Sequence, residues 1–335
     1  MGKLFGIELK LPFQSPYDWQ TILRFYQTHS VPGLEHVTEN SFARVFRINE
    51  VTGFVSVAIM IGKPQLKVSI APDAPEVRAD IVSRIRKMFD LDCDPMLIAR
   101  SFKEIPLLAG LCRRHPGLRL PRGWDPFETA ICSILGQLVS AQQRANLIGQ
   151  LVDHYGIEIA HPLAGHHTRL FPTAEVLASS DLSALKSTVA RREAIREFSR
   201  RVLTGAISLC QDQDRAAFRQ ALLAIKGLGP WSAEYISLRA IGDTDAFPKT
   251  DLILRRVLRL YPQLDLDLIK PWRSYAAVYL WKEFAQSLSK SKNEKNHDVI
   301  LQRNRSTGRQ AQTSRKLQRF GRGSLAKRTA KPSKT

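Results

Sequence analysis

The sequence predicts an α+β N-terminal domain, a small antiparallel sheet with helices, followed by an all-α domain and a disordered basic C-terminal tail. Three observations support this prediction. Runs rich in β-branched and aromatic residues are confined to the first part of the chain, helical periodicity takes over from about Cys93, and Lys and Arg crowd the last fifty residues. We place the domains at residues 1–92, 93–289 and 290–335.

The first domain is predicted to contain four strands and two helices. The strands are Leu4–Leu11, Phe42–Ile48, Phe54–Ile61 and Leu66–Ile70, with a hairpin turn at Thr52-Gly53 between the middle two. One helix follows Ser15-Pro16 and runs to about Thr28, and a second begins at Pro75 with its apolar residues on one face. An antiparallel sheet with both helices on one side is the economical arrangement.

The second domain begins its helical pattern most clearly at Asp125-Pro126-Phe127-Glu128, where an N-cap Asp precedes Pro and Glu. A second capping box, Ser140-Ala141-Gln142-Gln143, lies inside the apolar stripe that follows. We therefore predict two helices, Phe127–Gly136 and Ala141–Tyr155, with a turn at Gln137–Val139; one uninterrupted helix is the alternative. Later helices are predicted at Leu182–Leu203, Arg215–Ile225, Trp231–Ile241, Leu252–Tyr261 and Trp272–Leu288.

Charge points to a polyanionic partner. The 335 residues carry 50 Lys and Arg against 31 Asp and Glu, a net charge of +19. Residues 286–335 hold fourteen basic and two acidic side chains, net +12, which leaves 19 − 12 = +7 for the rest. This distribution favours nucleic acid, although a merely solubilising tail has the same composition. The tail itself is predicted to be disordered.

Other sequence features exclude several classes of protein. No run of eighteen apolar residues indicates a membrane span, and Glu8 falls where a signal peptide needs apolar residues. We expect an intracellular protein, cytoplasmic and nucleoid-associated if the source is prokaryotic. Four cysteines, Cys93, Cys112, Cys132 and Cys210, have spacings that fit no zinc site or iron–sulfur cluster, so buried free thiols are expected.

The most informative motif is Lys226-Gly227-Leu228-Gly229, which lies between a helix ending at Ile225 and another opened by Pro230. Two glycines allow a positive φ and a close approach of the backbone to a ligand. Free N–H groups at the start of the second helix form an anion site suited to a DNA phosphate. The alternative is a plain αα-hairpin with a glycine turn.

Asp251 stands at the predicted start of the helix Leu252–Tyr261. Its common role there is helix capping, which contributes ~1 kcal/mol. The same position suits a functional role, because the positive end of a helix favours an ionised carboxylate, and such a group stabilises a developing cation.

Together these residues resemble the helix–hairpin–helix and Gly/Pro…Asp signature of DNA glycosylases. Five segments resemble the DNA-3-methyladenine glycosylase II family more closely: Pro16-Tyr17-Asp18-Trp19, Leu118-Arg119-Leu120-Pro121, residues 134–140, residues 229–233 and residues 270–276. The resemblance covers roughly residues 4–285 and implies a helix–hairpin–helix glycosylase domain. It implies a monomeric, monofunctional enzyme without a cofactor that flips alkylated purines such as 3-methyladenine and 7-methylguanine out of double-stranded DNA and hydrolyses the N-glycosidic bond. Base excision repair would start there.

The resemblance also assigns roles to individual residues. Asp251 would be catalytic, Phe25, Trp231, Tyr235 and Trp272 would form the base pocket, and Lys226 to Gly229 would bind phosphate. Without the resemblance, these aromatic residues would be interpreted as core. Leu138 matches the wedge that fills the gap in the duplex, with membership of the buried stripe as the alternative.

Two positions depart from relatives. Enzymes of the superfamily that also cut the DNA backbone carry a nucleophilic lysine where this chain has Trp231, and Lys226 stands where many relatives have proline. We expect no metal site, with a monovalent cation at the carbonyls of Leu223, Ile225 and Leu228 as the one alternative left open. The alternatives are a related glycosylase for an oxidised or deaminated base and a non-catalytic DNA-binding protein, which the presence of Asp251 with the aromatic set disfavours.

Overall fold

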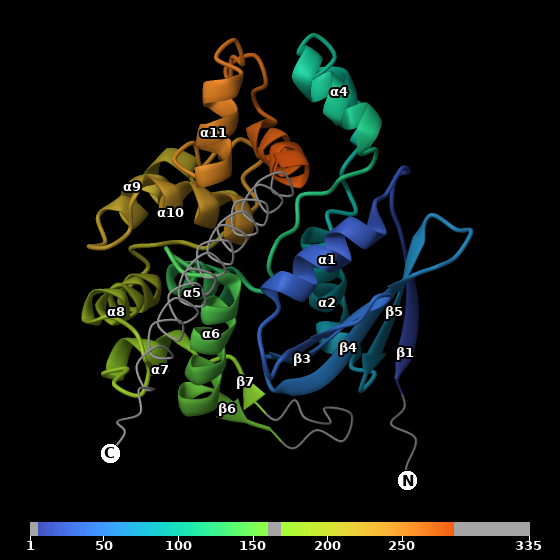
Figure 1. Ribbon diagram of the computed structural model, residues 1–335. Coiled ribbons are helices and arrows are strands. Elements are labelled where there is room, and N and C mark those ends of the chain that lie inside the picture. The colour runs from blue at the N-terminus through green and yellow to red at the C-terminus, as the bar shows by residue number, and fades with distance from the viewer. Residues whose placement is uncertain (1–5, 160–168, 285–335) are drawn as a thin grey trace, which may run out of the picture. The chain divides into compact units, whose positions relative to one another are not determined.

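The computed structural model describes residues 6–159 and 169–284 (Figure 1). Residues 1–282 form one compact unit, and a second unit comprises residues 283–335. The predicted strand start at Leu4, the helix end at Leu288 and the tail at 290–335 lie outside the described residues.

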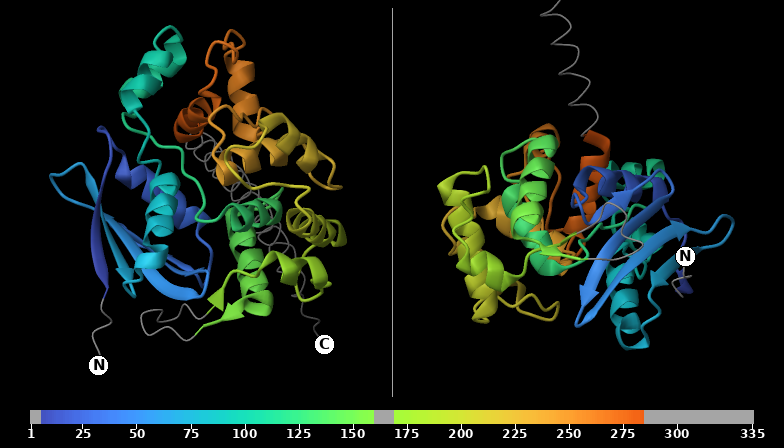
Figure 2. Two further views of the ribbon diagram at one scale, coloured as in Figure 1. Left: turned by 180° about the vertical axis from the view of Figure 1, so that it is seen from behind. Right: turned by 90° about the horizontal axis from the view of Figure 1, so that it is seen from below.

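The N-terminal part contains a five-stranded antiparallel sheet in the order β1-β5-β4-β3-β2 (Figure 1). The strands are β1 (Ile7–Pro12), β2 (Glu35–Val37), β3 (Ser41–Ile48), β4 (Val51–Ile59) and β5 (Gln65–Ala71). Leu9, Val68, Val57 and Phe42 are aligned across the strands, so they share one face of the sheet. Helices α1 (Trp19–His29) and α2 (Pro75–Met88) bury their apolar residues against this same face, as predicted (Figure 2).

The predicted hairpin turn at Thr52-Gly53 is wrong. The turn between β3 and β4 lies at Asn49-Glu50, where Asn49 has a φ of 52°, a conformation that Asn tolerates well. Gly53 lies inside β4 opposite Phe46, and a Cβ at Gly53 would meet that ring at 2.6 Å. Glycine is therefore required there for packing. The three-residue strand β2 was not predicted from the sequence.

The rest of the described chain is mainly helical. Its elements are α3 (Pro95–Ser101), α4 (Pro106–Arg114), α5 (Pro126–Leu135), α6 (Ala141–Tyr155), the short strands β6 (Ile157–Glu158) and β7 (Arg169–Leu170), α7 (Ala174–Ser179), α8 (Val189–Leu203), α9 (Arg215–Leu223), α10 (Pro230–Ile236), a π-helical segment Ser237–Ile241, α11 (Leu252–Leu260) and helical residues 273–284. Helix α5 contacts α6, α8, α10 and the π-helical segment, and eight of its ten residues are buried.

The two-helix interpretation of residues 127–155 is confirmed. Asp125 caps α5 by accepting from the N–H of Glu128, and Ser140 caps α6 by accepting from the N–H of Gln143. The predicted helix Leu182–Leu203 is too long, because Leu182 has a φ of 54° and Thr188 caps a helix that begins only at Val189. Similarly, Trp231–Ile241 is half α-helix and half π-helix.

Buried thiols were predicted at all four cysteines. All four are free, and Cys93, Cys112 and Cys132 are buried, but Cys210 is exposed and that part of the prediction is wrong. Cys210 lies in the connection between α8 and α9, outside the helices, and the segments next to them, that contain the other three cysteines. Within residues 6–159 and 169–284, no helix is long and apolar enough to cross a membrane.

Candidate active site

The hairpin motif joins α9 to α10 through a tight turn. Gly227 has a φ of 96°, which an L-residue rarely adopts, and the N–H of Leu228 closes the turn on the carbonyl of Ile225 at 3.0 Å. Gly229 is the N-cap of α10 and Pro230 its first residue, and nothing lies within 4 Å of a Cβ built on Gly229. Lys226 is exposed, while Leu228 is buried beneath the turn. The backbone at Gly229 is therefore open to a ligand.

Asp251 caps α11, as its position in the sequence predicts. Its Oδ1 accepts from the N–H groups of Ile253 (3.0 Å) and Leu254 (3.3 Å) and from the indole Nε1 of Trp281 (3.0 Å). Its Oδ2 accepts a single, longer bond from Nε1 of Trp231 (3.3 Å). Four N–H donors match an ionised carboxylate, which can only accept. Oδ1 accepts three of these hydrogen bonds and Oδ2 accepts one, so Oδ2 is better able to accept a further hydrogen bond from a ligand.

The aromatic side chains on α10 stand beside this carboxylate. Trp231 and Tyr235 are one helical turn apart and stack with centroids 4.8 Å apart and planes inclined by 10°. Trp281 packs edge-on against Tyr235 at 6.2 Å. Trp281 was not predicted as a site residue. Its part-buried indole N–H needs an acceptor and finds it in Asp251, 30 positions away, which no local sequence pattern reveals.

The other two predicted pocket residues are placed differently. Phe25, on α1, stacks on His29 with a centroid distance of 4.0 Å, and the guanidinium of Arg239 lies 4.2 Å from its ring. Arg239 also lies 5.8 Å from the ring of Tyr235, so it connects Phe25 to the aromatic pair on α10. Trp272 packs edge-on against Tyr275 at 5.9 Å, just before the helix that carries Trp281.

Buried surroundings suppress protonation of His29. Removal from water and the positive charges of Arg239 and Arg144 lower the pKa of His29 to about 3. Its imidazole is therefore neutral at physiological pH and stacks on Phe25 as an uncharged ring.

Leu138 is fully exposed, at 105 %, in the turn between α5 and α6. Its membership of the buried stripe is therefore excluded. Its φ of 54° is uncommon for a leucine, and such backbone strain is concentrated at functional sites. The neighbouring Gln137 anchors the turn, since its side chain donates to Ser232 of α10 and its carbonyl accepts from Arg191 of α8.

The loop that delivers Asp251 is fixed by ion pairs. Arg219 of α9 contacts Glu234 of α10 (2.9 Å) and Asp243 (2.6 Å), and Glu234 also accepts from the N–H of Phe247. Arg273 binds Asp245 through two hydrogen bonds of 2.7 and 2.8 Å. The segment before α11 is thus tied to three other elements, which positions the carboxylate.

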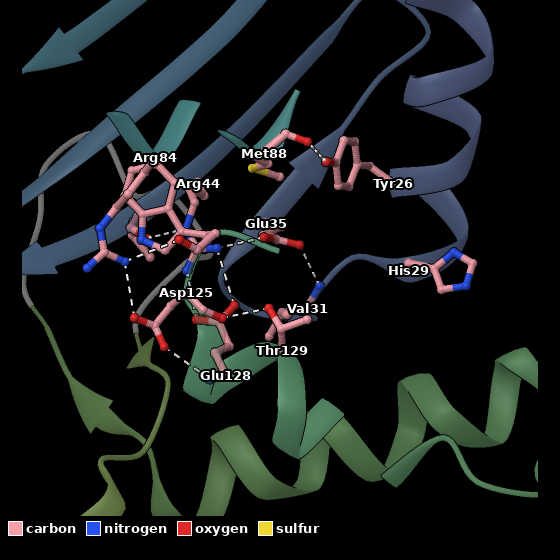
Figure 3. A network of polar contacts seen from close by, with 12 residues as sticks. Tyr26, His29, Val31, Glu35, Arg44, Arg84, Met88, Asp125, Glu128 and Thr129 are labelled. Carbon is pink, nitrogen blue, oxygen red and sulfur yellow. Dashed lines mark hydrogen bonds and ion pairs between the residues drawn. The ribbon is translucent and has the colours of Figure 1, made fainter. Parts of the chain in front are cut away.

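A second carboxylate cluster lies deeper, where β3 meets α5 (Figure 3). Arg44 pairs with Glu35 at 2.7 Å and with Glu128 at 3.0 Å, and all three side chains are buried. A second ion pair, between Arg84 and Asp125 at 3.1 Å, lies beside this cluster (Figure 3). Burial raises the pKa of Glu128 to about 7 and also raises that of Glu35, while the charge of Arg44 opposes both shifts.

The sequence predicts no metal site and leaves open only a monovalent cation at the hairpin carbonyls. Within the described residues, no group of three or more His, Cys, Asp or Glu side chains is placed to hold a metal. One of the three carbonyls, that of Ile225, already accepts the N–H of Leu228. A monovalent cation at Leu223, Ile225 and Leu228 stays a prediction.

The fold and site define a protein of the helix–hairpin–helix DNA glycosylase fold. The 3-methyladenine DNA-glycosylase from Archaeoglobus fulgidus has a similar structure, with a TM-score of 0.67, 18% identity, and coverage of 82% of this chain and 97% of the other. The profile of the AlkA N-terminal domain matches residues 8–125.

Two named relatives are more similar in sequence. The Escherichia coli DNA-3-methyladenine glycosylase 2 is 31% identical over 278 residues, covering 81% of this chain and 95% of that protein. A probable bifunctional transcriptional activator/DNA repair enzyme AlkA of Mycobacterium tuberculosis is 32% identical over 283 residues, covering 82% of this chain. The match spans just over half, 56%, of that protein's length. This chain belongs to the DNA-3-methyladenine glycosylase II (AlkA) family.

Proposed function

We propose that this protein is a monofunctional DNA glycosylase that flips alkylated purines out of double-stranded DNA and hydrolyses their N-glycosidic bond. The observation that carries the proposal is Asp251, a carboxylate held by four N–H donors beside the stacked rings of Trp231 and Tyr235. The family membership supports the same activity.

DNA binding follows from the backbone and the charge. N–H groups at the start of α10 suit a phosphate, and Lys226 adds a cation beside them. Helix α11 exposes three further cations directly after Asp251, namely Arg255, Arg256 and Arg259. Leu138, exposed on a strained and anchored turn, would enter the duplex and occupy the place of the flipped nucleotide.

Chemistry follows from charge development at the sugar. An alkylated purine is electron-poor and stacks on aromatic faces, with ~0.5–2 kcal/mol for each cation–π contact. As the base leaves, positive charge grows on the deoxyribose, and the freer Oδ2 of Asp251 is available to stabilise that charge or to accept a proton from the attacking water. The two indole N–H groups hold the carboxylate in place during this step.

Strand cleavage is not expected from this site. Trp231 occupies the position of the lysine nucleophile, and Lys226 precedes the glycines. We therefore infer that the product is an intact abasic strand, released by a monomeric enzyme without a cofactor.

The decisive experiment incubates the purified protein with methylated duplex DNA and identifies the released bases by mass spectrometry. We expect free 3-methyladenine and 7-methylguanine from the wild type, and release slowed by about 10²–10³-fold from Asp251→Asn. Absence of both bases with the wild type would refute the proposal. Stoichiometric trapping of a covalent DNA adduct with borohydride would refute its monofunctional part.

The alternatives predict other outcomes in the same assay. A glycosylase for oxidised or deaminated bases would release 8-oxoguanine or hypoxanthine but no methylated purine. A non-catalytic DNA-binding protein would retain duplex DNA without releasing any base.

A further inference from the structure

Arg239 is a buried cation without an ion pair among the residues that the structure describes. It belongs to the π-helical segment after α10, is 6% exposed, and has no hydrogen-bond partner at Nε or Nη1 within that part of the chain. The Arg239 side chain lines a cavity of about 40 Å³, and His29, Glu35 and Glu128 line the same cavity. Such a cavity has room for water, which can satisfy these N–H groups without neutralising the charge.

The guanidinium is one layer of a stacked column. Arg239 and His29 lie 4.2 and 4.0 Å from Phe25, and two groups of this size fit only on opposite faces of its ring. Trp231, Tyr235 and Arg239 are spaced four residues apart along the chain. The ring centroids of Trp231 and Tyr235 are 4.8 Å apart, and the guanidinium carbon of Arg239 lies 5.8 Å from the Tyr235 centroid. The column therefore runs from Trp231, beside Asp251, through Tyr235 and Arg239 to Phe25 and His29.

This arrangement changes the role of Phe25. Both of its faces are covered, so a base cannot stack on it while the column is intact. Trp231 is the end of the column nearest the carboxylate, and its outer face is the surface on which a flipped base would stack. That base would then lie roughly 12–14 Å from the charge of Arg239, a distance of a few stacked layers.

Resting on the proposed function, we propose that Arg239 is a specificity-determining residue that lowers the preference of the pocket for cationic bases relative to neutral ones. A lesion such as 7-methylguanine carries a formal positive charge, and hypoxanthine carries none. A unit charge at that distance changes the affinity for a cation by about five- to tenfold at an effective dielectric constant of ~20, and leaves a neutral base nearly unaffected. Burial protects this interaction from screening by salt.

A purely structural role makes a different prediction. If Arg239 only held Phe25 and Tyr235 in place, its replacement would slow excision of every lesion by the same factor. The ratio of the excision rates on a cationic and a neutral lesion separates the two roles. A general loss of active-site structure lowers both rates by the same factor, so it leaves this ratio unchanged.

The test uses single-turnover excision of 7-methylguanine and hypoxanthine from otherwise identical duplexes by the full-length protein. Arg239→Gln and Arg239→Met remove the charge, and Met fills the space between the two rings with an apolar chain of similar length. We expect the ratio of cationic to neutral excision to rise five- to tenfold in both variants, and to stay at the wild-type value in Arg239→Lys. Arg84→Gln is the matched control, since Arg84 also lies over an aromatic ring, Trp124, but outside the column.

An unchanged ratio in Arg239→Gln and Arg239→Met, with both rates lowered equally, would overturn the inference. A wild type that releases neither base would refute the proposed function, so the two failures are distinguishable. Measuring the ratio at low and moderate salt adds a further check, because a salt-dependent ratio would show that exposed charges, not Arg239, set the preference.

Discussion

The carboxylates of Asp251 and Glu128 differ in burial and in the groups that bind them. Asp251 is half-buried and surrounded by four neutral N–H donors. Glu128 is buried and faces the guanidinium of Arg44 with both oxygens. Burial raises the pKa of Glu128 to about 7.

Under the proposed function, the carboxylate with the raised pKa, Glu128, is not the reacting group. Shifted values are concentrated at functional sites in general, but structural ion pairs shift them too. Glu128 is occupied by Arg44 and packed between β3 and α5, whereas Asp251 keeps Oδ2 largely unused at the end of a helix. The proposed role of Asp251 therefore rests on its available oxygen beside an aromatic surface.

The largest effect is expected at Asp251. Asp251→Asn keeps the size and the capping capacity but removes the negative charge, so single-turnover excision of 7-methylguanine should fall by about 10²–10³-fold. Thermal unfolding should shift little, since the cap remains. Glu128→Gln should excise at nearly the wild-type rate once folded; an equal loss of rate in both variants would erase the contrast.

The reverse pattern is expected for stability. Glu128→Ala leaves the buried Arg44 with only Glu35 as its partner, and should reduce the free energy of unfolding by about 3 kcal/mol. Asp251→Ala should cost only ~1 kcal/mol, the value of a lost N-cap. Urea unfolding monitored by circular dichroism checks both, and a larger loss at Asp251 than at Glu128 would contradict the assigned roles.

His29 extends the comparison to pH. Its pKa is about 3 in the folded protein and ~6.5 in the unfolded chain, so the unfolded state binds the proton first as the pH falls. Its contribution to stability is therefore fully present above pH ~6.5 and is lost progressively as the pH falls towards 3. Allowing for partial exposure, the loss should reach roughly 1–2 kcal/mol at pH ~5.

His29→Phe keeps a ring on Phe25 without a titrating nitrogen. The difference in melting temperature between pH 7.5 and pH 5 should be smaller in this variant than in the wild type. Parallel pH profiles for the two proteins would show that His29 contributes nothing to acid sensitivity.

The smallest effect on stability is expected at Leu138. Because the side chain is fully exposed, Leu138→Ala should leave the free energy of unfolding unchanged within about 0.5 kcal/mol. Excision should nevertheless fall by about tenfold, since the flipped state loses the side chain that fills the duplex. Ile61, equally exposed in the turn between β4 and β5, provides the control: Ile61→Ala should alter neither quantity.

Local sequence signals predicted the elements that depend on local chemistry. The caps at Asp125, Ser140 and Asp251 and the hairpin at Gly227 are encoded within four or five residues, and each is where the pattern indicates. The Thr52-Gly53 turn failed because Gly53 is dictated by Phe46 on the next strand, which no local pattern reveals.

Site residues that belong to a local motif could be predicted from the sequence. Site residues that come together from distant parts of the chain could not. Trp281 lies 30 positions along the chain from Asp251, and Arg239 lies 214 positions from Phe25. Neither Trp281 nor Arg239 belongs to a hairpin or cap signature. In the ion cluster of Glu35, Arg44 and Glu128, the contact between Arg44 and Glu128 joins residues 84 positions apart. Side chains of this kind become recognisable only once the sheet and α5 are packed together.

In the proposed mechanism, one carboxylate serves both as helix cap and as reactive group, and this has a genetic consequence. Asp and Asn codons differ by a single nucleotide, and Asn caps a helix about as well as Asp does. One transition at codon 251 would thus yield a folded, DNA-binding protein that no longer releases the base. Such a copy would compete with the active protein for the same lesions without releasing the base.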